Sequence, residues 1–290
     1  AILLTSHLPI HDHVTETVYL KKKCYRCYPP QLGRKRTVTT MLVACIQGTK
    51  TRLNAWQATR ENGPFACPAC GREVVLHKGT IRAHHFAHKA NSDCAHGVGE
   101  TELHRRAKMQ IYQTLSIVPA LRCDLEAPLD GVRADVLIQS VNTKRTYAIE
   151  VQISQLSMAQ IIERTRRYAK QGVYVLWLFE WRNDLLSDCY APSLKERWAH
   201  ALHFGHVYYW RGGDKVTSVK FTKYMLWRNY YDGESYSEEY GYEYVSKRYR
   251  TPIVEDDLFI SRDFQGVKRA AWSGGDIVIP ACRILTARSL

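Results

Sequence analysis

The chain of 290 residues lacks any apolar run near the length of a membrane-spanning helix, which is about twenty residues. It also lacks, at its start, the charged-then-apolar pattern of a secretory signal. No internal repeat is evident, which argues against solenoid and propeller architectures. We therefore expect an intracellular, cytoplasmic protein with no membrane partner.

Acidic residues are few relative to basic ones. The chain has 28 Asp and Glu against 41 Lys and Arg, for a formal net charge of +13. Because phosphate contacts dominate nucleic-acid affinity, this excess favours a polyanionic partner. The argument is weak alone, since many basic proteins never touch nucleic acid. Residues 1–40 hold seven basic and two acidic residues, so +8 remains in the rest of the chain.

Cysteine is present in an odd number, nine, and two pairs are spaced as Cys-x-x-Cys. In a long chain of a reducing compartment this spacing favours metal over disulfide. Cys24 and Cys27 have no obvious partner pair; they could complete a second site, although two free cysteines are the simpler interpretation.

The pattern of apolar residues divides the chain into four parts. We expect residues 1–40 to be a leader or appended segment, because Met41 opens a strand-rich run. Residues 41–98 have the short strands and turns of a small β-rich module. An α/β core follows over 99–221, and 222–290 form a tyrosine-rich extension without a fold signal after residue 249.

The order of elements in the core is helix, strand, strand, strand, helix, strand. One apolar stripe predicts a first helix over 100–118, and a second helix ends at Gly172. A continuous apolar run then predicts a strand buried on both faces. A hairpin turning at Gly212-Gly213 is expected to close the core. The ranges are strands at 133–139, 146–154 and 172–179, the second helix at 156–171 and the hairpin at 201–221.

A zinc site is predicted from a knuckle and a cluster of ligands behind it. Cys67 and Cys70 can bind one tetrahedral ion across a tight turn. The other two ligands come from His85, His88 and Cys94, and we favour His88 with Cys94. A site fully ligated by protein is structural rather than catalytic. The alternative is a pair of buried free cysteines beside surface histidines.

Carboxylates within the predicted strands form the second candidate site. Asp135 lies mid-strand, and Glu150 and Gln152 share one face of the next strand because side chains alternate. If the two strands are adjacent, Asp135 and Glu150 converge as a hard-oxygen site for magnesium or manganese. The alternative is the polar, solvent-facing side of a half-exposed sheet.

Helix residues complete the candidate set. Glu100, His104 and Lys108 stay on one side of the first helix, a spacing that is more often a surface charge ladder. Tyrosines between Tyr224 and Tyr249 could stack on unpaired bases. Acidic residues among them would repel phosphate, so a packed or flexible appendage is favoured there; these are Asp232, Glu234, Glu238, Glu239 and Glu243.

The ordered set of motifs resembles the competence protein CoiA-like family, whose nuclease domain belongs to the PD-(D/E)XK, restriction-endonuclease-like superfamily. The resemblance covers about residues 41–221. It rests on MLVA at 41, CPAC at 67–70, HFAH at 85–88, GETELH with Lys108, RADV around Asp135, AIEVQIS around Glu150, ERTRRY at 163–168 and VLWLF.

The resemblance implies that Asp135 and Glu150 are the metal-binding acids. Glu100, His104 and Lys108 match the first-helix signature of the family. Glu100 is the candidate for a further metal ligand. Gln152 stands where most of the superfamily has lysine, so we take Lys108 as the candidate cation. Arg164 and Tyr168 match a second-helix signature that contacts substrate or supports the sheet. The function implied is magnesium-dependent hydrolysis of DNA, in DNA uptake. The alternatives are a non-catalytic zinc-containing DNA-binding protein and a restriction or defence nuclease.

Overall fold

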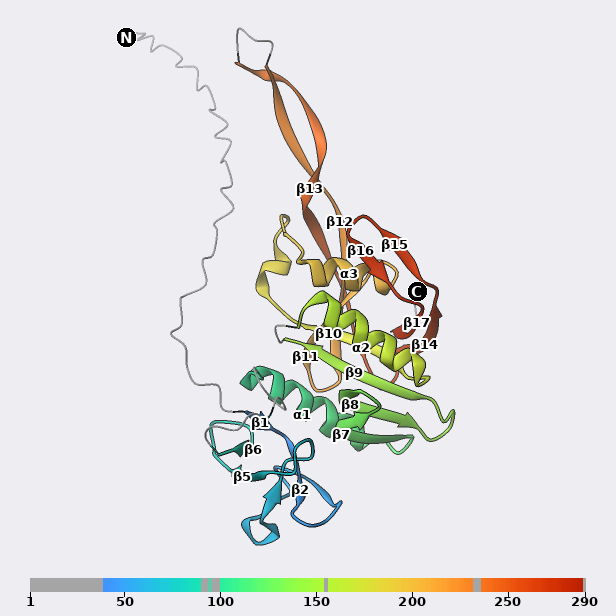
Figure 1. Cartoon of the computed structure of the whole chain (residues 1–290). Helices are drawn as coiled ribbons and strands as arrows, with labels where there is room; N and C mark the ends of the chain where they lie inside the picture. Colours follow the sequence, from blue (N-terminus) through green and yellow to red (C-terminus); the bar gives the residue numbers. More distant parts are fainter. Residues whose placement is uncertain (1–38, 90–93, 95–99, 154–155, 232–235, 289–290) are drawn as a thin grey trace, which may run out of the picture. The chain divides into compact units, whose positions relative to one another are not determined.

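The computed structural model describes residues 39–89, 94, 100–153, 156–231 and 236–288, and side chains outside 230–240 (Figure 1). These residues belong to one compact unit, Thr37–Leu290. The expected leader, apart from Thr39 and Thr40, lies outside the described residues, as do Cys24 and Cys27. No helix in the described residues is long and apolar enough to cross a membrane.

Six short strands form an antiparallel sheet at the start of the described chain, in the order β1-β6-β5-β4-β2-β3. Its core is small and includes Met41, Val74 and the pair Phe65 and Phe86, whose ring centroids are 5.0 Å apart. Such a small core buries little apolar surface, and domains of this size commonly need a structural metal or another cross-link for stability. The strands are β1 Thr40–Met41, β2 Val43–Ile46, β3 Arg52–Asn54, β4 Phe65–Ala66, β5 Glu73–His77 and β6 His85–His88.

The next six elements follow the predicted order of helix, three strands, helix and strand. Thr101 caps the first helix by accepting a hydrogen bond from the His104 amide. Gly172, at φ +74°, follows the second helix, where a left-handed residue ends a helix without a Cβ penalty. The elements are α1 Glu102–Ser116, β7 Leu121–Leu129, β8 Val132–Ser140, β9 Thr146–Gln152, α2 Met158–Lys170 and β10 Tyr174–Glu180.

These strands belong to a larger sheet whose two faces are both covered. β7, β8 and β9 form an antiparallel meander, and β10 then runs parallel to β9. One face packs on α1 through Ala107, Ile111 and Leu115. The other face packs on α2 and on α3 (Leu194–Leu202), a helix that the sequence analysis did not predict. Six residues of β10, Tyr174–Phe179, are buried, as the continuous apolar run predicted.

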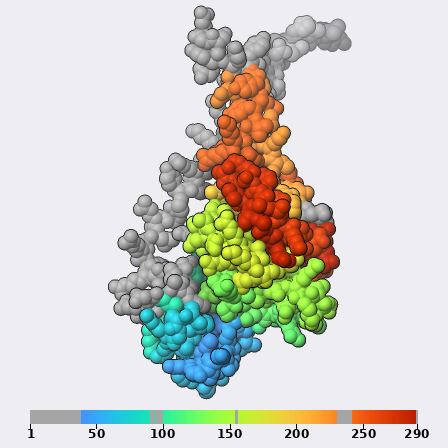
Figure 2. Space-filling view, turned by 45° about the vertical axis from the view of Figure 1, so that its right-hand side comes forward, coloured from blue at the N-terminus to red at the C-terminus, as the bar shows by residue number. Residues whose placement is uncertain are grey.

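The C-terminal third extends this sheet. The hairpin turning at Gly212-Gly213 is confirmed, with both glycines at positive φ, but residues 201–202 end α3 rather than start a strand. We found no fold signal after residue 249, yet β17 lies parallel beside β10. Figure 2 shows the β12–β13 hairpin standing out from the rest of the described surface. The remaining strands are β11 Val207–Gly212, β12 Lys215–Tyr231, β13 Tyr236–Phe259, β14 Phe264–Arg269, β15 Trp272–Gly274, β16 Ile277–Ile279 and β17 Cys282–Ala287.

Candidate functional site

Three cysteines and one histidine converge in the N-terminal sheet. The ligand atoms of Cys67, Cys70, His88 and Cys94 all lie within 4.8 Å of one another. Cys67 Sγ is 3.9 Å from Cys94 Sγ, and Cys70 Sγ is 3.8 Å from His88 Nε2. Tetrahedral zinc with Zn–S bonds of about 2.3 Å separates its sulfur ligands by about 3.8 Å. The donor set and its spacing therefore fit a structural zinc ion.

The knuckle between Cys67 and Cys70 is built by its backbone. The Gly71 amide donates to the Cys67 carbonyl at 2.9 Å, and the Cys67 amide donates to the Arg72 carbonyl at 2.8 Å. Gly71 has φ +72°, which glycine adopts without steric cost. The local sequence thus turns the chain back sharply enough to aim both thiols at one point.

His85 does not belong to this cluster, although it was an alternate ligand in the sequence analysis. His85 and His88 both lie on β6, and three residues along a strand reverse the face on which a side chain lies. The His85 ring instead stacks on His77, with centroids 5.1 Å apart, and its Nδ1 lies 2.8 Å from the Ala83 carbonyl oxygen. Strand alternation therefore selects His88.

Asp135 and Glu150 lie where two paired strands separate. The ladder between β8 and β9 ends at the pair Val136 and Ile149, so the two acids occupy the next position on each strand. Beyond that point the Val151 amide donates to Asp135 Oδ2 at 2.9 Å, in place of a backbone acceptor. Both acids are buried. The structure thus brings together two carboxylates that are fifteen positions apart in the sequence.

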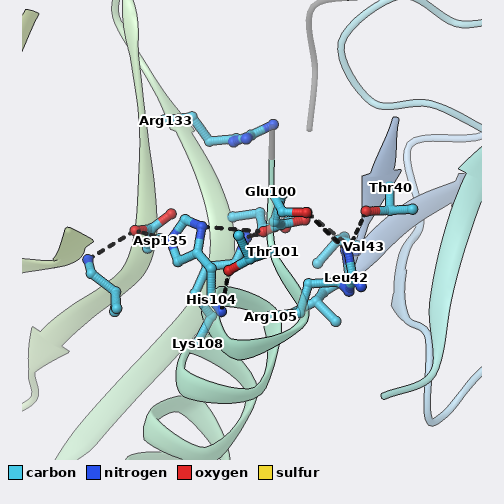
Figure 3. Close-up of polar contacts among 12 residues, drawn as sticks. Thr40, Leu42, Val43, Glu100, Thr101, His104, Arg105, Lys108, Arg133 and Asp135 are labelled. Atoms are coloured by element: carbon cyan, nitrogen blue, oxygen red, sulfur yellow. Dashed lines mark hydrogen bonds and ion pairs between the residues drawn. The ribbon is translucent and has the colours of Figure 1, made fainter. Parts of the chain in front are cut away.

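Asp135 is held as an anion by its neighbours. Burial alone would raise the pKa of its carboxyl, but His104, Lys108 and Arg164 outweigh this effect and hold the pKa well below its usual range. The nearest of these is His104, whose Nε2 lies 3.0 Å from Asp135 Oδ2. Figure 3 shows His104 between Asp135 and Glu100, with its Nδ1 3.7 Å from Glu100 Oε1.

Glu150 is enclosed by two residues of α2. Arg164 Nη2 lies 2.6 Å from both carboxylate oxygens, and the Tyr168 hydroxyl donates to Glu150 Oε1. Burial raises the pKa of the Glu150 carboxyl, and the Arg164 guanidinium opposes that rise. The second-helix residues Arg164 and Tyr168 therefore contact a site acid directly, and Arg164 also donates to the Arg133 carbonyl at 2.7 Å.

Lys108 is fully buried, so this structure offers it no contact with a substrate phosphate. Its ammonium lies between the carboxylates of Glu100 and Glu126, at 2.5 Å from Glu126 Oε1. Burial lowers the pKa of this ammonium, but the two carboxylates outweigh burial and raise the pKa above its usual value. In this structure Lys108, which we took as the candidate catalytic cation, forms buried ion pairs with Glu100 and Glu126.

Glu126 was missed by the sequence analysis. Its Oε2 accepts hydrogen bonds from the Leu42 and Val43 amides at 3.2 and 3.3 Å, and its Oε1 accepts one from Lys108 of α1. Glu126 therefore joins the N-terminal segment to α1. Glu126 has φ +49°, a left-handed conformation that costs about 1 kcal/mol for a residue other than glycine. Such a conformation inside a strand has no signature in the local sequence, so only the structure identifies this residue.

We expect Lys108→Ala to lower the free energy of unfolding by about 3 kcal/mol or more, because it leaves two buried carboxylates without their shared cation. Urea unfolding measures this change. Arg106→Ala, on the exposed face of the same helix, is the matched control and should change it by less than about 0.5 kcal/mol. An equal effect of the two substitutions would show that Lys108 does not hold this network together.

A basic cleft of about 720 Å³ is linked to Glu150 through Arg164, whereas Asp135 and Glu150 do not themselves line it. Its lining includes Lys50, Arg52, Arg133 and Arg164, with Glu126 as the one acidic residue. Arg52 is engaged by Asp124 at 2.7 Å, whereas the Arg133 guanidinium has no ion-pair or hydrogen-bond partner in the described part of the chain. Arg133 was quoted in the RADV motif without a role. Gln152 is also buried, and it lines a separate cleft with Lys195.

The acids of the core meet part of what a magnesium ion requires. Glu100 Oε2 is a buried carboxylate oxygen without a hydrogen-bond partner among the described residues, and Asp135 and Glu150 add further hard-oxygen donors. In this structure the charge of Glu150 is already neutralised by Arg164. Among the described residues, three or more metal-ligating atoms lie close together only at the Cys3His group. The donor types therefore fit magnesium, while in this structure Arg164 and Tyr168 hold the Glu150 carboxylate.

A Cys3His module followed by an α/β domain with acids at a strand fork defines a zinc-site-bearing, nuclease-like class of protein. The N-terminal domain of competence protein CoiA matches residues 48–97, and the nuclease-like domain of competence protein CoiA matches residues 100–191. The chain belongs to the competence protein CoiA family.

A curated relative agrees with this assignment. The chain is 28% identical over 115 residues to a protein named Competence protein CoiA from Bacillus subtilis (strain 168). The match covers 39% of this chain and 31% of that relative, so it spans about a third of the relative's length. No solved structure matched the chain.

Proposed function

We propose that this protein is a magnesium- or manganese-dependent nuclease that hydrolyses DNA phosphodiester bonds, with a restriction-endonuclease-like core over 99–221. Residues 41–98 would form its zinc-binding module, and 222–290 would extend the core. The observation that carries the proposal is the convergence of Asp135 and Glu150 at one strand fork, where Arg164 connects Glu150 to a cleft lined by four basic residues and one acidic residue.

Asp135, Glu150 and Glu100 are the residues that would hold the metal. When bound, it would polarise the phosphate and lower the pKa of a water molecule. Asp135 is suited to this role because it stays ionised at neutral pH. Arg164 lines the cleft and contacts Glu150, so a substrate phosphate entering the cleft competes for its guanidinium. Transfer of Arg164 to the phosphate would release the Glu150 carboxylate.

Arg133 replaces Lys108 in our proposal as the cation that faces the phosphate. We expect Arg133→Ala to slow single-turnover cleavage about a hundredfold, the scale for losing one preorganised charge. Arg122→Ala is the matched control, because Arg122 is an exposed arginine toward the other end of the β7–β8 hairpin. If Arg133→Ala weakened DNA binding but left the cleavage rate unchanged, Arg133 would only contact the phosphate backbone of the DNA and would not act in cleavage.

The proposal is tested by incubating the purified chain with single-stranded, duplex and branched DNA, with magnesium, with manganese and with neither. Cleavage that requires the metal and disappears in Asp135→Asn is the expected result. Cleavage that persists in Asp135→Asn would contradict the proposal, because the strand fork would then not hold the catalytic metal.

A second candidate function has one observation in its favour. Arg164 and Tyr168 occupy the Glu150 carboxylate, and Gln152 stands where the superfamily has lysine. A site locked in this arrangement would bind nucleic acid without cutting it, as a zinc-containing DNA-binding protein. Arg164→Ala separates the two functions: it should activate or impair cleavage in a nuclease, and change only binding in the alternative.

A further inference from the structure

The β12–β13 hairpin continues well beyond the sheet from which it starts. β12 pairs with β13 along its length from Lys215, whereas β11 pairs with β12 only as far as Val219. We call residues 222–229 and 241–251 the arm. The arm lies outside both family matches, which end at residue 191. Its role is therefore not explained by the nuclease-like domain.

The two strands of the arm are basic, although the segment 230–240 between them has four acidic residues and brings the net charge of 222–251 to zero. The arm has five basic residues and one acidic residue, Glu243. None of the five basic side chains forms an ion pair with a carboxylate in the described part of the chain. Lys223 and Arg250 lie directly opposite each other, and like charges in that position destabilise a hairpin. An anionic ligand would relieve this repulsion. The basic residues are Lys223, Arg228, Lys247, Arg248 and Arg250.

Aromatic rings are interleaved with these charges. Arg228 pairs with Tyr242 across the hairpin and lies over the Tyr244 ring, 5.5 Å from its centroid. Arg248 lies over the Tyr249 ring at 5.3 Å. Tyr242 is 49% exposed, so its ring can be reached by a ligand. Flat rings with guanidinium groups beside them suit bases that are not paired, because every base offers a face for stacking.

We propose that the arm binds single-stranded nucleic acid, with its basic side chains on phosphates and Tyr242 stacked on a base. Acidic residues argued against this interpretation in the sequence analysis. Apart from Glu243, they lie in the segment 232–239, whose side chains the structure does not describe. The exposed hydrophobic residues Met225 and Trp227 would also suit a protein partner or a second copy of the chain. The basic side chains of the arm, which form no ion pair in the described part of the chain, favour a polyanion over both. The arm proposal rests on the proposed nuclease function in one respect only, which is the choice of DNA as the polyanion.

The test measures binding of the full chain to a fluorescein-labelled single-stranded DNA and to its duplex, by anisotropy at several salt concentrations. Magnesium is omitted, so that cleavage does not enter the result. We expect Lys247→Ala/Arg248→Ala to reduce the slope of log affinity against log salt by about 1.4 for the single strand, because each phosphate contact contributes about 0.7. Tyr242→Ala should weaken single-strand binding about tenfold and leave that slope unchanged.

The matched control is Lys144→Ala/Lys268→Ala, which removes the same charge from exposed lysines outside the arm. Circular dichroism and zinc content check that each variant is folded. Unchanged affinity and slope in both arm variants, or a loss confined to duplex, would overturn the proposal. A change of oligomeric state without a change in DNA binding would assign the arm to a second copy instead.

This result is separate from that of the cleavage test. If the arm variants bind DNA weakly while no metal-dependent cleavage is found, the arm proposal stands and the proposed function fails. If the arm variants bind normally and cleavage depends on Asp135, the arm proposal alone fails.

Discussion

Asp135→Asn should reduce metal-dependent DNA cleavage by about a thousandfold or more, because the amide cannot supply the negative charge that a magnesium ion requires. The substitution keeps the shape of the side chain, and its oxygen can still accept the Val151 amide hydrogen bond that closes the strand fork. Glu150→Gln should have a comparable effect. DNA binding should stay intact or become stronger, since removal of negative charge does not weaken attraction to phosphate. Single-turnover rates and anisotropy measure the two effects.

Two further variants make this prediction specific. Glu163→Gln removes an exposed carboxylate from α2 and should leave the rate unchanged. Gln152→Ala should be milder than either acid substitution, because a neutral amide can orient water but cannot supply charge. Asp135→Asn with unchanged cleavage would exclude the strand fork as the metal site.

Cys67→Ser should remove the bound zinc, from about one ion per chain to none, and unfold the N-terminal sheet. The hydrophobic core of that sheet is small, so we expect metal coordination to contribute much of its stability. Loss of the sheet would also remove the Leu42 and Val43 amides from Glu126. Elemental analysis and thermal unfolding measure these changes.

Cys45→Ser is the matched control, because Cys45 is a free cysteine of β2 outside the ligand cluster. It should keep its zinc and unfold near the wild-type temperature. Full zinc content in a Cys67→Ser/Cys70→Ser double variant would contradict the assigned ligands.

Local patterns predicted the elements that are defined by their own residues. The apolar stripe predicted the helix α1, and the continuous apolar run predicted the buried strand β10. Both predictions lie within a few residues of the observed bounds. The strands beyond residue 249 escaped prediction because their short, mixed segments become stable only beside partners far away in sequence. β17, for example, pairs with β10 more than a hundred positions earlier.

The sequence by itself determined the family and the candidate residues, because these depend on residue types at fixed spacings along the chain. The candidates are the four zinc ligands, with His85 as an alternate, and the two acids proposed to bind magnesium. Only the tertiary structure decided that His88 rather than His85 completes the cluster, since strand alternation sets the face. It also decided that Lys108 is buried between Glu100 and Glu126. The environment of a charge depends on what packs around it from distant segments, and no local pattern records that.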